Sequence, residues 1–323
     1  MEIQNSFSLL THERIVEIEE LISRQADGFH PDIKSALNIL LSAGGKRVRP
    51  ILTLLVGDML GAEQKRLVTM AASIELLHTA TLVHDDLIDE SLLRRGTPTL
   101  NSKWSPGATV LTGDFLFSRA AMLAAETNSL AAMKIFAATL SQIVNGEINQ
   151  LLSKQISYKR EDYYQRIEAK TASLFRTSTC TAAIISESNQ KIINGMSNFG
   201  YNIGMAFQIL DDILDLTGEQ EKLGKPIGSD LRQGLITLPT ILFLENYPND
   251  EHSKLLINGN LLNDAEKIDV FISKLQWANT IQESLKIAQE YVDKAISYLD
   301  GYCKSLQHDA LLDLAKYIVD RTI

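Results

Sequence analysis

The chain of 323 residues is acidic, with 31 Lys and Arg against 40 Asp and Glu and a net charge of −9. Hydrophobic residues make up 45% of it, enough for a large core and too many for an intrinsically disordered chain. The acidic total argues against a nucleic-acid-binding protein, whose affinity depends on basic side chains that neutralise phosphates. The two cysteines, Cys180 and Cys303, form no CxxC pair and predict neither a zinc site nor a disulfide framework.

Hydrophobic periodicity predicts an almost wholly helical chain. No linker rich in Pro, Gly or Ser divides it, so we expect one all-α domain over residues 1–323. The predicted helices cover residues 10–25, 31–42, 46–61, 64–90, 105–125, 128–153, 160–188, 190–217, 233–246, 262–275, 277–301 and 307–321. The clearest predicted loops are Arg94–Gly107, Thr217–Gly234 and Asn246–Asn263.

The sequence indicates neither a signal peptide nor a transmembrane segment. Met1–Leu10 has no basic region and no long apolar run. The longest candidate span, the charge-free stretch Ile192–Leu210, contains four amide side chains that would be costly in hydrocarbon. We therefore expect an interior helix there and a cytoplasmic protein.

An acidic run, Asp85-Asp86-Leu87-Ile88-Asp89, stands near the end of an apolar predicted helix. At 100° per residue, Asp85 and Asp89 lie about 40° apart on one face and about 6 Å apart along the axis. Two carboxylates at that spacing suit a hard divalent cation such as Mg²⁺. A solvated helix end is the other reading, although acidic charge at a C-terminus opposes the helix dipole.

A second run, Asp211-Asp212-Ile213-Leu214-Asp215, follows 126 residues later, again near the end of a long apolar helix. Each run crowds like charges, which is unfavourable unless cations are bound. The pair of runs therefore predicts a metal site.

Basic residues that a phosphate ligand needs accompany the runs. The segment Gly44–Pro50, GGKRVRP, is a glycine turn that leads into a helix and supplies Lys and Arg side chains. Arg94 and Arg95 follow Asp89, and arginine matches diphosphate oxygens in bidentate fashion. Lys170-Thr171 and Lys225 would each be ordinary surface residues on their own.

Other histidine and glycine motifs are incomplete. His78 faces the same way as Asp85, seven residues earlier, although a lone helical histidine is more often a core residue. Glu75-x-x-His78 is half of a di-iron pattern that has no second ExxH. GxGxxG, the P-loop and GxSxG do not occur.

Together these motifs resemble those of the trans-type isoprenyl (polyprenyl) diphosphate synthases. In chain order they are GGKRVRP at 44–50, LLHTATLVHDDLIDESLLRRGTPT at 76–99, GEINQ at 146–150, KTASLF at 170–175, FQILDDILD at 207–215 and GKPIGSDLRQG at 224–234. The resemblance covers residues 30 to 240 and implies the all-α isoprenoid synthase bundle. The two aspartate runs would face each other across a deep cavity.

The resemblance also implies a role for each matching residue. Three Mg²⁺ ions would be held by Asp85, Asp89, Asp211 and Asp215. The allylic diphosphate would be bound by Arg94, Lys170, Thr171, Gln208 and Lys225. Isopentenyl diphosphate would be bound by Lys46, Arg49, His78 and Arg95. The catalytic groups would be Asp85, Asp89, Arg94, Lys170, Asp211 and Lys225.

The implied reaction is the Mg²⁺-dependent head-to-tail condensation of isopentenyl diphosphate onto an allylic diphosphate. In the family, residues just before the first run form the cavity floor, and an aromatic residue there blocks elongation. Here those positions are the small Ala80 and Thr81, and Leu77 comes next. We therefore expect a product of six or more isoprene units. The alternative is a farnesyl or geranylgeranyl product, if Phe136 or Met133 stops the chain sooner.

Other readings fit less well. A terpene cyclase shares the fold and metals but lacks the isopentenyl cation set, which is present here. A non-catalytic partner subunit would lose an aspartate run, and a purely structural helical protein leaves both runs unexplained. A homodimer is implied by the resemblance, while a catalytic subunit that needs a partner stays open.

Overall fold

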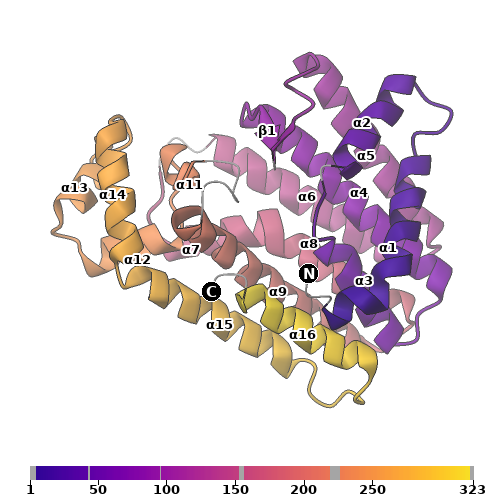
Figure 1. The fold of residues 1–323 in the computed structure, drawn as a ribbon. Helices are drawn as coiled ribbons and strands as arrows, with labels where there is room; N and C mark the ends of the chain where they lie inside the picture. Colours follow the sequence, from indigo (N-terminus) through magenta and orange to yellow (C-terminus); the bar gives the residue numbers. More distant parts are fainter. Residues whose placement is uncertain (1–4, 43, 95, 153–155, 219–225, 321–323) are drawn as a thin grey trace. The chain divides into compact units, whose positions relative to one another are not determined.

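The computed structural model describes residues 5–42, 44–94, 96–152, 156–218 and 226–320, which form helices and one two-stranded hairpin (Figure 1). The elements are α1 Ser6–Arg24, α2 Pro31–Ser42, α3 Val48–Met59, α4 Gln64–Ile88, β1 Leu93–Arg94, β2 Thr97–Pro98, α5 Pro106–Glu126, α6 Leu130–Leu152, α7 Arg160–Ile167, the π-helix η1 Glu168–Ala172, α8 Ser173–Ile185, α9 Gln190–Thr217, α11 Ser229–Arg232, α12 Leu238–Asn246, α13 Glu251–Ile257, α14 Ala265–Trp277, α15 Thr280–Ser297 and α16 Leu306–Asp320.

The all-α prediction is confirmed, with four local corrections. The predicted helix 160–188 is broken by η1, where a π-turn replaces α-helical bonding, and ends at Ile185. The predicted loop Asn246–Asn263 contains the short helix α13, whose N-cap Asp250 accepts a hydrogen bond from the His252 backbone N–H. The predicted loop Arg94–Gly107 takes part in the β1–β2 hairpin. The predicted loop Thr217–Gly234 contains the short helix α11, and residues 219–225 of it lie outside the described residues.

Contacts group the chain into two compact units. Unit 1 comprises Met1–Ser141, Leu174–Gly200 and Tyr298–Leu314. Unit 2 comprises Gln142–Ser173, Tyr201–Ser297 and Ala315–Ile323.

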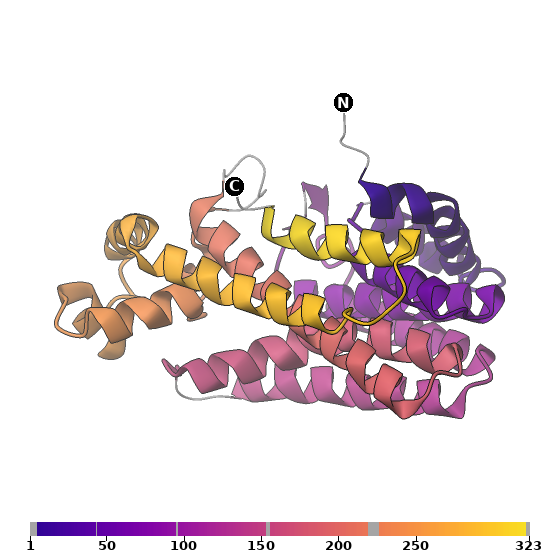
Figure 2. The ribbon, with the colours of Figure 1, turned by 90° about the horizontal axis from the view of Figure 1, so that it is seen from below.

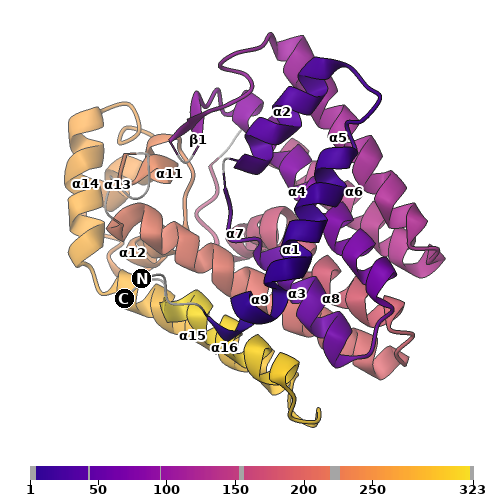
Figure 3. The ribbon, with the colours of Figure 1, turned by 45° about the vertical axis from the view of Figure 1, so that its right-hand side comes forward.

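Helix α4 is the central element of unit 1. It packs against α1, α3 and α5, as Figures 1 and 3 show. The Ser73 hydroxyl donates to the Ala120 carbonyl at 2.7 Å, which joins α4 to α5 inside the core. Among the described helices, α4 alone is long and apolar enough to cross a bilayer, and 78% of its most apolar window is buried in the protein. It is therefore a core helix. From the sequence, Ile192–Leu210 is the longest candidate membrane span, whereas among the described helices α4 is the one that meets the criteria of length and hydropathy.

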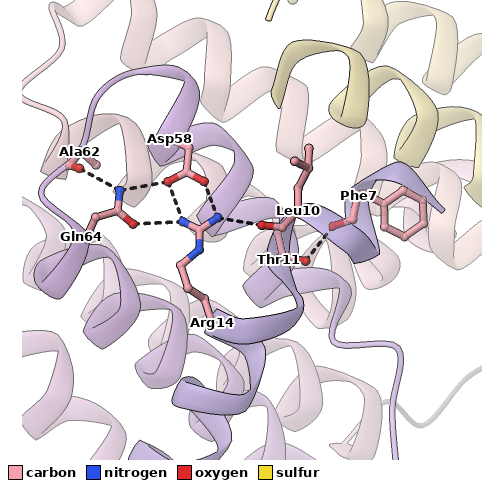
Figure 4. Close-up of polar contacts among 7 residues, drawn as sticks. All are labelled: Phe7, Leu10, Thr11, Arg14, Asp58, Ala62 and Gln64. Atoms are coloured by element: carbon pink, nitrogen blue, oxygen red, sulfur yellow. Dashed lines mark hydrogen bonds and ion pairs between the residues drawn. The ribbon is translucent and has the colours of Figure 1, made fainter. Parts of the chain in front are cut away.

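An arginine–carboxylate pair fixes α1 to the rest of unit 1 (Figure 4). Arg14 on α1 donates to both carboxylate oxygens of Asp58 on α3, at 2.6 and 2.5 Å. Gln64, the first residue of α4, accepts from Arg14 at 3.0 Å and donates to Asp58 at 3.1 Å. Such a bidentate pair restrains orientation as well as distance, so α1 is held in a defined register against α3 and α4.

In unit 2, α12, α14 and α15 pack together in the orange to yellow part of the chain (Figure 2). Phe243 of α12 meets Phe271 of α14 edge-to-face, with ring centroids 5.2 Å apart. Arg166 of α7 donates to the Ile236 carbonyl and ties the start of this segment to α7. The cluster gives unit 2 an aromatic core of its own.

Helices α8 and α9 approach closely at Gly200 within unit 1. The Thr179 hydroxyl of α8 donates to the Met196 carbonyl of α9 at 2.6 Å. A Cβ on Gly200 would lie 2.5 Å from the Phe175 carbonyl oxygen and closer still to the Thr179 hydroxyl. Glycine is therefore the residue that this crossing accommodates.

Replacing Gly200 by Ala should destabilise the protein by about 2–3 kcal/mol, because the added methyl group meets backbone that has no room to move. Gly195, on the same helix, is the matched control, since its nearest contact would be the Tyr302 hydroxyl at 3.9 Å. Gly195→Ala should stabilise by about 0.5–1 kcal/mol through helix propensity. Urea unfolding of both variants measures this, and equal effects would contradict the packing argument.

Candidate active site

The first acidic run lies where α4 ends. The backbone N–H of the C-cap Asp89 bonds to the Asp85 carbonyl at 2.8 Å, so both residues stay on the last helical turn as predicted. Asp85 is half-buried and Asp89 is exposed. The last turn of α4 contains no basic residue. This end of the helix therefore gathers negative charge at the negative end of the helix dipole, which favours a bound cation.

The middle aspartate of this run has a different role. Asp86 is buried and accepts from Arg94 Nε at 2.8 Å. Burial raises the pKa of Asp86, and the adjacent Arg94 guanidinium opposes that rise. Arg94, predicted to bind the allylic diphosphate, is thus oriented by Asp86 while its side chain stays 36% exposed.

The neighbouring His84 fastens the end of α4 to α5. Its ring nitrogen Nε2 lies 3.1 Å from the Val110 carbonyl oxygen, and its ring meets Phe117 edge-on. The ring fills the space at Gly113, where a Cβ would collide with it. The His84-Asp85 pair thus combines a packing histidine with a candidate metal ligand.

Of the predicted isopentenyl diphosphate residues, Lys46, Arg49 and His78 lie in unit 1, as do the chain-length residues. Lys46 is exposed in the segment before α3, and the Arg49 guanidinium lies 4.6 Å from the centre of the Phe175 ring. On α4, His78 is half-buried, and its carbonyl accepts from the Thr81 hydroxyl at 2.7 Å. The remaining chain-length residues, Leu77 and Ala80, are fully buried.

The second acidic run lies on α9 in unit 2. Asp211 is half-buried, whereas Asp212 and Asp215 are buried. The Asp215 carboxylate accepts from the Ser229 hydroxyl at 3.0 Å and from the Asp230 backbone N–H at 3.1 Å. These bonds join the run to the GKPIGSDLRQG motif.

A chain of side-chain hydrogen bonds surrounds Asp212. The Thr171 hydroxyl donates to Gln208 Oε1 at 2.6 Å, and Gln208 Nε2 donates to Asp212 at 2.8 Å. The Tyr163 hydroxyl donates to the other Asp212 oxygen at 2.8 Å. Burial, with the Asp230 charge as a second cause, raises the pKa of Asp212 to about 8. The structure thus connects the predicted allylic-site residues Thr171 and Gln208 to the second run.

Lys170, another predicted diphosphate ligand, lies on the π-turn η1. Its ammonium group pairs with Glu147 of α6 at 2.9 Å, and its side chain is 37% exposed. Short π-helical turns often occur at functional sites, because they change the direction of side chains within a helix. Lys170 and Thr171 therefore share a locally adapted stretch of backbone.

Two predicted site residues, Arg95 and Lys225, lie outside the described residues. Several structural partners were not predicted from the sequence: Asp86, Asp212, Tyr163, Glu147, Ser229 and Asp230. Glu147 stands in GEINQ, and Ser229 and Asp230 stand in GKPIGSDLRQG, so the motifs contain the signal. Tyr163 lies outside every motif, and its role depends on a tertiary contact.

Candidate metal ligands occur in both units. In the part of the chain that the structure describes, no three His, Cys, Asp or Glu side chains come together as one cluster. The candidate donors are carboxylate oxygens, which suit hard cations such as Mg²⁺ and Ca²⁺. Metal binding by Asp85, Asp89, Asp211 and Asp215 therefore stays a prediction, and the chemistry of their carboxylates agrees with it.

The helical fold and the two acidic runs define a class of α-helical prenyltransferases. The sequence profile described as Polyprenyl synthetase matches residues 30–275. The chain therefore belongs to the polyprenyl synthetase family and is a prenyltransferase that elongates prenyl chains.

Relatives support this assignment along the whole chain. A heptaprenyl diphosphate synthase component 2 from Geobacillus stearothermophilus is 36% identical, covering 99% of both proteins. A geranylgeranyl diphosphate synthase from Saccharolobus solfataricus is 35% identical, covering 87% of this chain and 88% of its own. The polyprenyl synthase from Caulobacter crescentus, solved in complex with calcium and isoprenyl diphosphate, has a TM-score of 0.92 at 32% identity, covering 98% of both chains.

Replacing Tyr163 by Phe should destabilise the protein by about 1–3 kcal/mol, because Asp212 loses a buried hydrogen-bond donor. It should also raise the divalent-cation concentration that gives the half-maximal rate, since the second run loses an anchor. Tyr158→Phe is the matched control, because its hydroxyl donates to the Leu256 carbonyl, away from the run. An unchanged divalent-cation requirement in Tyr163→Phe would show that the bond serves stability alone.

Proposed function

We propose that the protein condenses isopentenyl diphosphate head-to-tail onto an allylic diphosphate in the cytoplasm and builds an all-trans polyprenyl diphosphate of six or more isoprene units. Family membership supports the reaction type. The observation that carries the chain length is the pair of small residues Ala80 and Thr81, one turn ahead of the first acidic run. Ala80 is fully buried on α4, where a larger side chain would occupy more of the unit 1 interior.

The reaction breaks the allylic C–O bond heterolytically, and the electron pair leaves with the diphosphate. The double bond of isopentenyl diphosphate then attacks the allylic carbon, and a proton passes to the released diphosphate. Fixed cations lower the barrier because they stabilise the charge that develops on the leaving group. In this proposal Arg94, Lys170 and Lys225 have that role. Isopentenyl diphosphate is held by Lys46, Arg49, His78 and Arg95, and Thr171 and Gln208 complete the allylic site.

Magnesium is the proposed cofactor, with three ions held by Asp85, Asp89, Asp211 and Asp215. Bound Mg²⁺ acts as a Lewis acid that neutralises diphosphate charge. Support comes from the carboxylate donors at the end of α4 and on α9 and from the calcium in the Caulobacter crescentus relative.

The direct test is an incubation of the purified protein with Mg²⁺, isopentenyl diphosphate and farnesyl diphosphate, with products separated by chain length. We expect a ladder that ends at C30 or beyond. Chelation should abolish turnover and added Mg²⁺ should restore it, because the acidic runs need cations to bind diphosphate. A ladder that ends at C15 or C20 would contradict the long product, and the absence of condensation with every allylic primer would reject a stand-alone synthase.

Replacing Ala80 by Phe should shorten the product to C15–C20, because the ring would take up space that the small side chain leaves for the growing chain. Thr81→Phe should act in the same direction. Thr81→Val is the matched control: it keeps the size and removes only the hydroxyl that bonds to the His78 carbonyl. Mass spectrometry of the products measures the lengths, and a wild-type length in both Phe variants would place the stop elsewhere.

A second candidate is a catalytic component of a heteromeric synthase. The observation in its favour is the relative named heptaprenyl diphosphate synthase component 2. Exposed apolar side chains on the described part of unit 1, Leu111, Met122 and Leu130, support a subunit interface, which a homodimer would also use. A folded protein that binds Mg²⁺ and diphosphate without condensation would favour this candidate over the homodimeric synthase.

A further inference from the structure

The segment Gly44–Pro50 contains three cationic side chains, and the proposed function uses only Lys46 and Arg49. We propose that the third, Arg47, is a positioning residue: through its ion pair with Glu75 it holds this segment in the conformation that binds isopentenyl diphosphate. The inference rests on the proposed function, since it concerns the same substrate site. The sequence motif alone does not show which of its basic residues bind substrate and which one holds the segment in place.

The Arg47 guanidinium is turned into the protein and is already bonded there. Nε donates to Glu19 at 2.8 Å, Nη1 to Glu75 at 2.9 Å and Nη2 to the Leu41 carbonyl at 3.1 Å. The side chain is only 11% exposed. Every nitrogen of the guanidinium thus has a partner inside the protein, which argues against Arg47 as a diphosphate ligand.

The backbone at Arg47 is in an unusual conformation. Arg47 is the N-cap of α3 and has φ 46° and ψ 32°, the left-handed region that residues with a Cβ rarely adopt. Such a conformation persists only where the surroundings impose it. Here the three guanidinium bonds supply that restraint, and they act on the residue directly after Lys46 and two before Arg49.

Four helices of unit 1 contribute to this restraint. Leu41 lies near the end of α2, Arg47 is the N-cap of α3, Glu19 lies on α1 and Glu75 lies on α4. The Arg14–Asp58 pair in Figure 4 fixes α1 against α3 and so helps to keep Glu19 in reach. The conformation of the segment before α3 is therefore coupled to the packing of α1 and α4.

Glu75 is the most buried partner of Arg47 and depends on it for charge compensation. Its side chain is 6% exposed, so its charge requires the guanidinium opposite it. The pair also raises the pKa of Arg47, although burial alone would lower it. Glu75 precedes His78 by three residues, about 60° away around α4. The Glu75-x-x-His78 motif thus links the restrained segment to a second predicted isopentenyl diphosphate ligand.

The test compares Arg47→Gln, Glu75→Gln and the double variant with the unchanged protein in steady-state kinetics. We expect each single variant to raise the KM for isopentenyl diphosphate about tenfold, as for the loss of one charge-assisted hydrogen bond. The KM for the allylic diphosphate should change less than about twofold. The double variant should be no worse than the singles, because the two residues act as one unit.

Arg66→Gln is the matched control, since it removes another ion-paired arginine of unit 1, one that bonds to the Thr127 carbonyl and pairs with Glu187 and has no contact with the Arg47 network. It should lower the unfolding midpoint while leaving both KM values unchanged. Glu75→Gln decides the question if Arg47→Gln does not fold, because it is isosteric and removes only the negative charge opposite the guanidinium.

Two results would overturn the inference. An unchanged or lower KM for isopentenyl diphosphate in Glu75→Gln would mean that Arg47 binds substrate itself or plays no part. Loss of stability in the Arg47 and Glu75 variants, with unchanged KM values as in Arg66→Gln, would mean that the pair is only structural. A folded, unchanged protein that consumes no isopentenyl diphosphate would reject the proposed function, and that result is separate from any effect of the variants.

Discussion

Crowding of negative charge on two helices is the constraint on which the rest of this structure depends. Within each acidic run the middle carboxylate is buried and takes a protein partner, Arg94 for Asp86 and Tyr163 with Gln208 for Asp212. In the first run this separates the buried Asp86 from the outer Asp85 and Asp89, whereas in the second run the outer Asp215 is also buried and accepts from Ser229 and Asp230. The division in the first run is physically reasonable, because a buried carboxylate needs hydrogen-bond donors whereas a metal ligand needs access to the ion.

Helix α4 shows how one core element serves several needs. Its length places Glu75, His78, Ala80 and Asp85 within three turns. Because α1, α3 and α5 all pack against it, small changes in those contacts act on the predicted substrate, chain-length and metal residues together. The buried Arg47–Glu75 pair and the His84 contact with α5 fix this helix near its middle and near its end.

In unit 2 the second run depends on segments that are distant in sequence. Tyr163 and Thr171 come from the region of α7 and η1, and Ser229 and Asp230 come from α11. Their bonds to α9 connect the motif KTASLF and the motif GKPIGSDLRQG to the same acidic run. The order of the motifs along the chain thus reflects a set of tertiary contacts.

The sequence by itself determined the helical class, most of the helices and the residue types of the site. Apolar periodicity is a local property, so α2 and α9 begin and end where it predicts. The acidic runs could also be recognised as a candidate metal site from the sequence, because crowded like charges are unfavourable unless cations are bound. Tertiary structure alone decided the π-turn at Lys170 and the partners of Asp86, Asp212 and Arg47. These features arise from contacts between segments far apart in the chain, and no local pattern of residues specifies them.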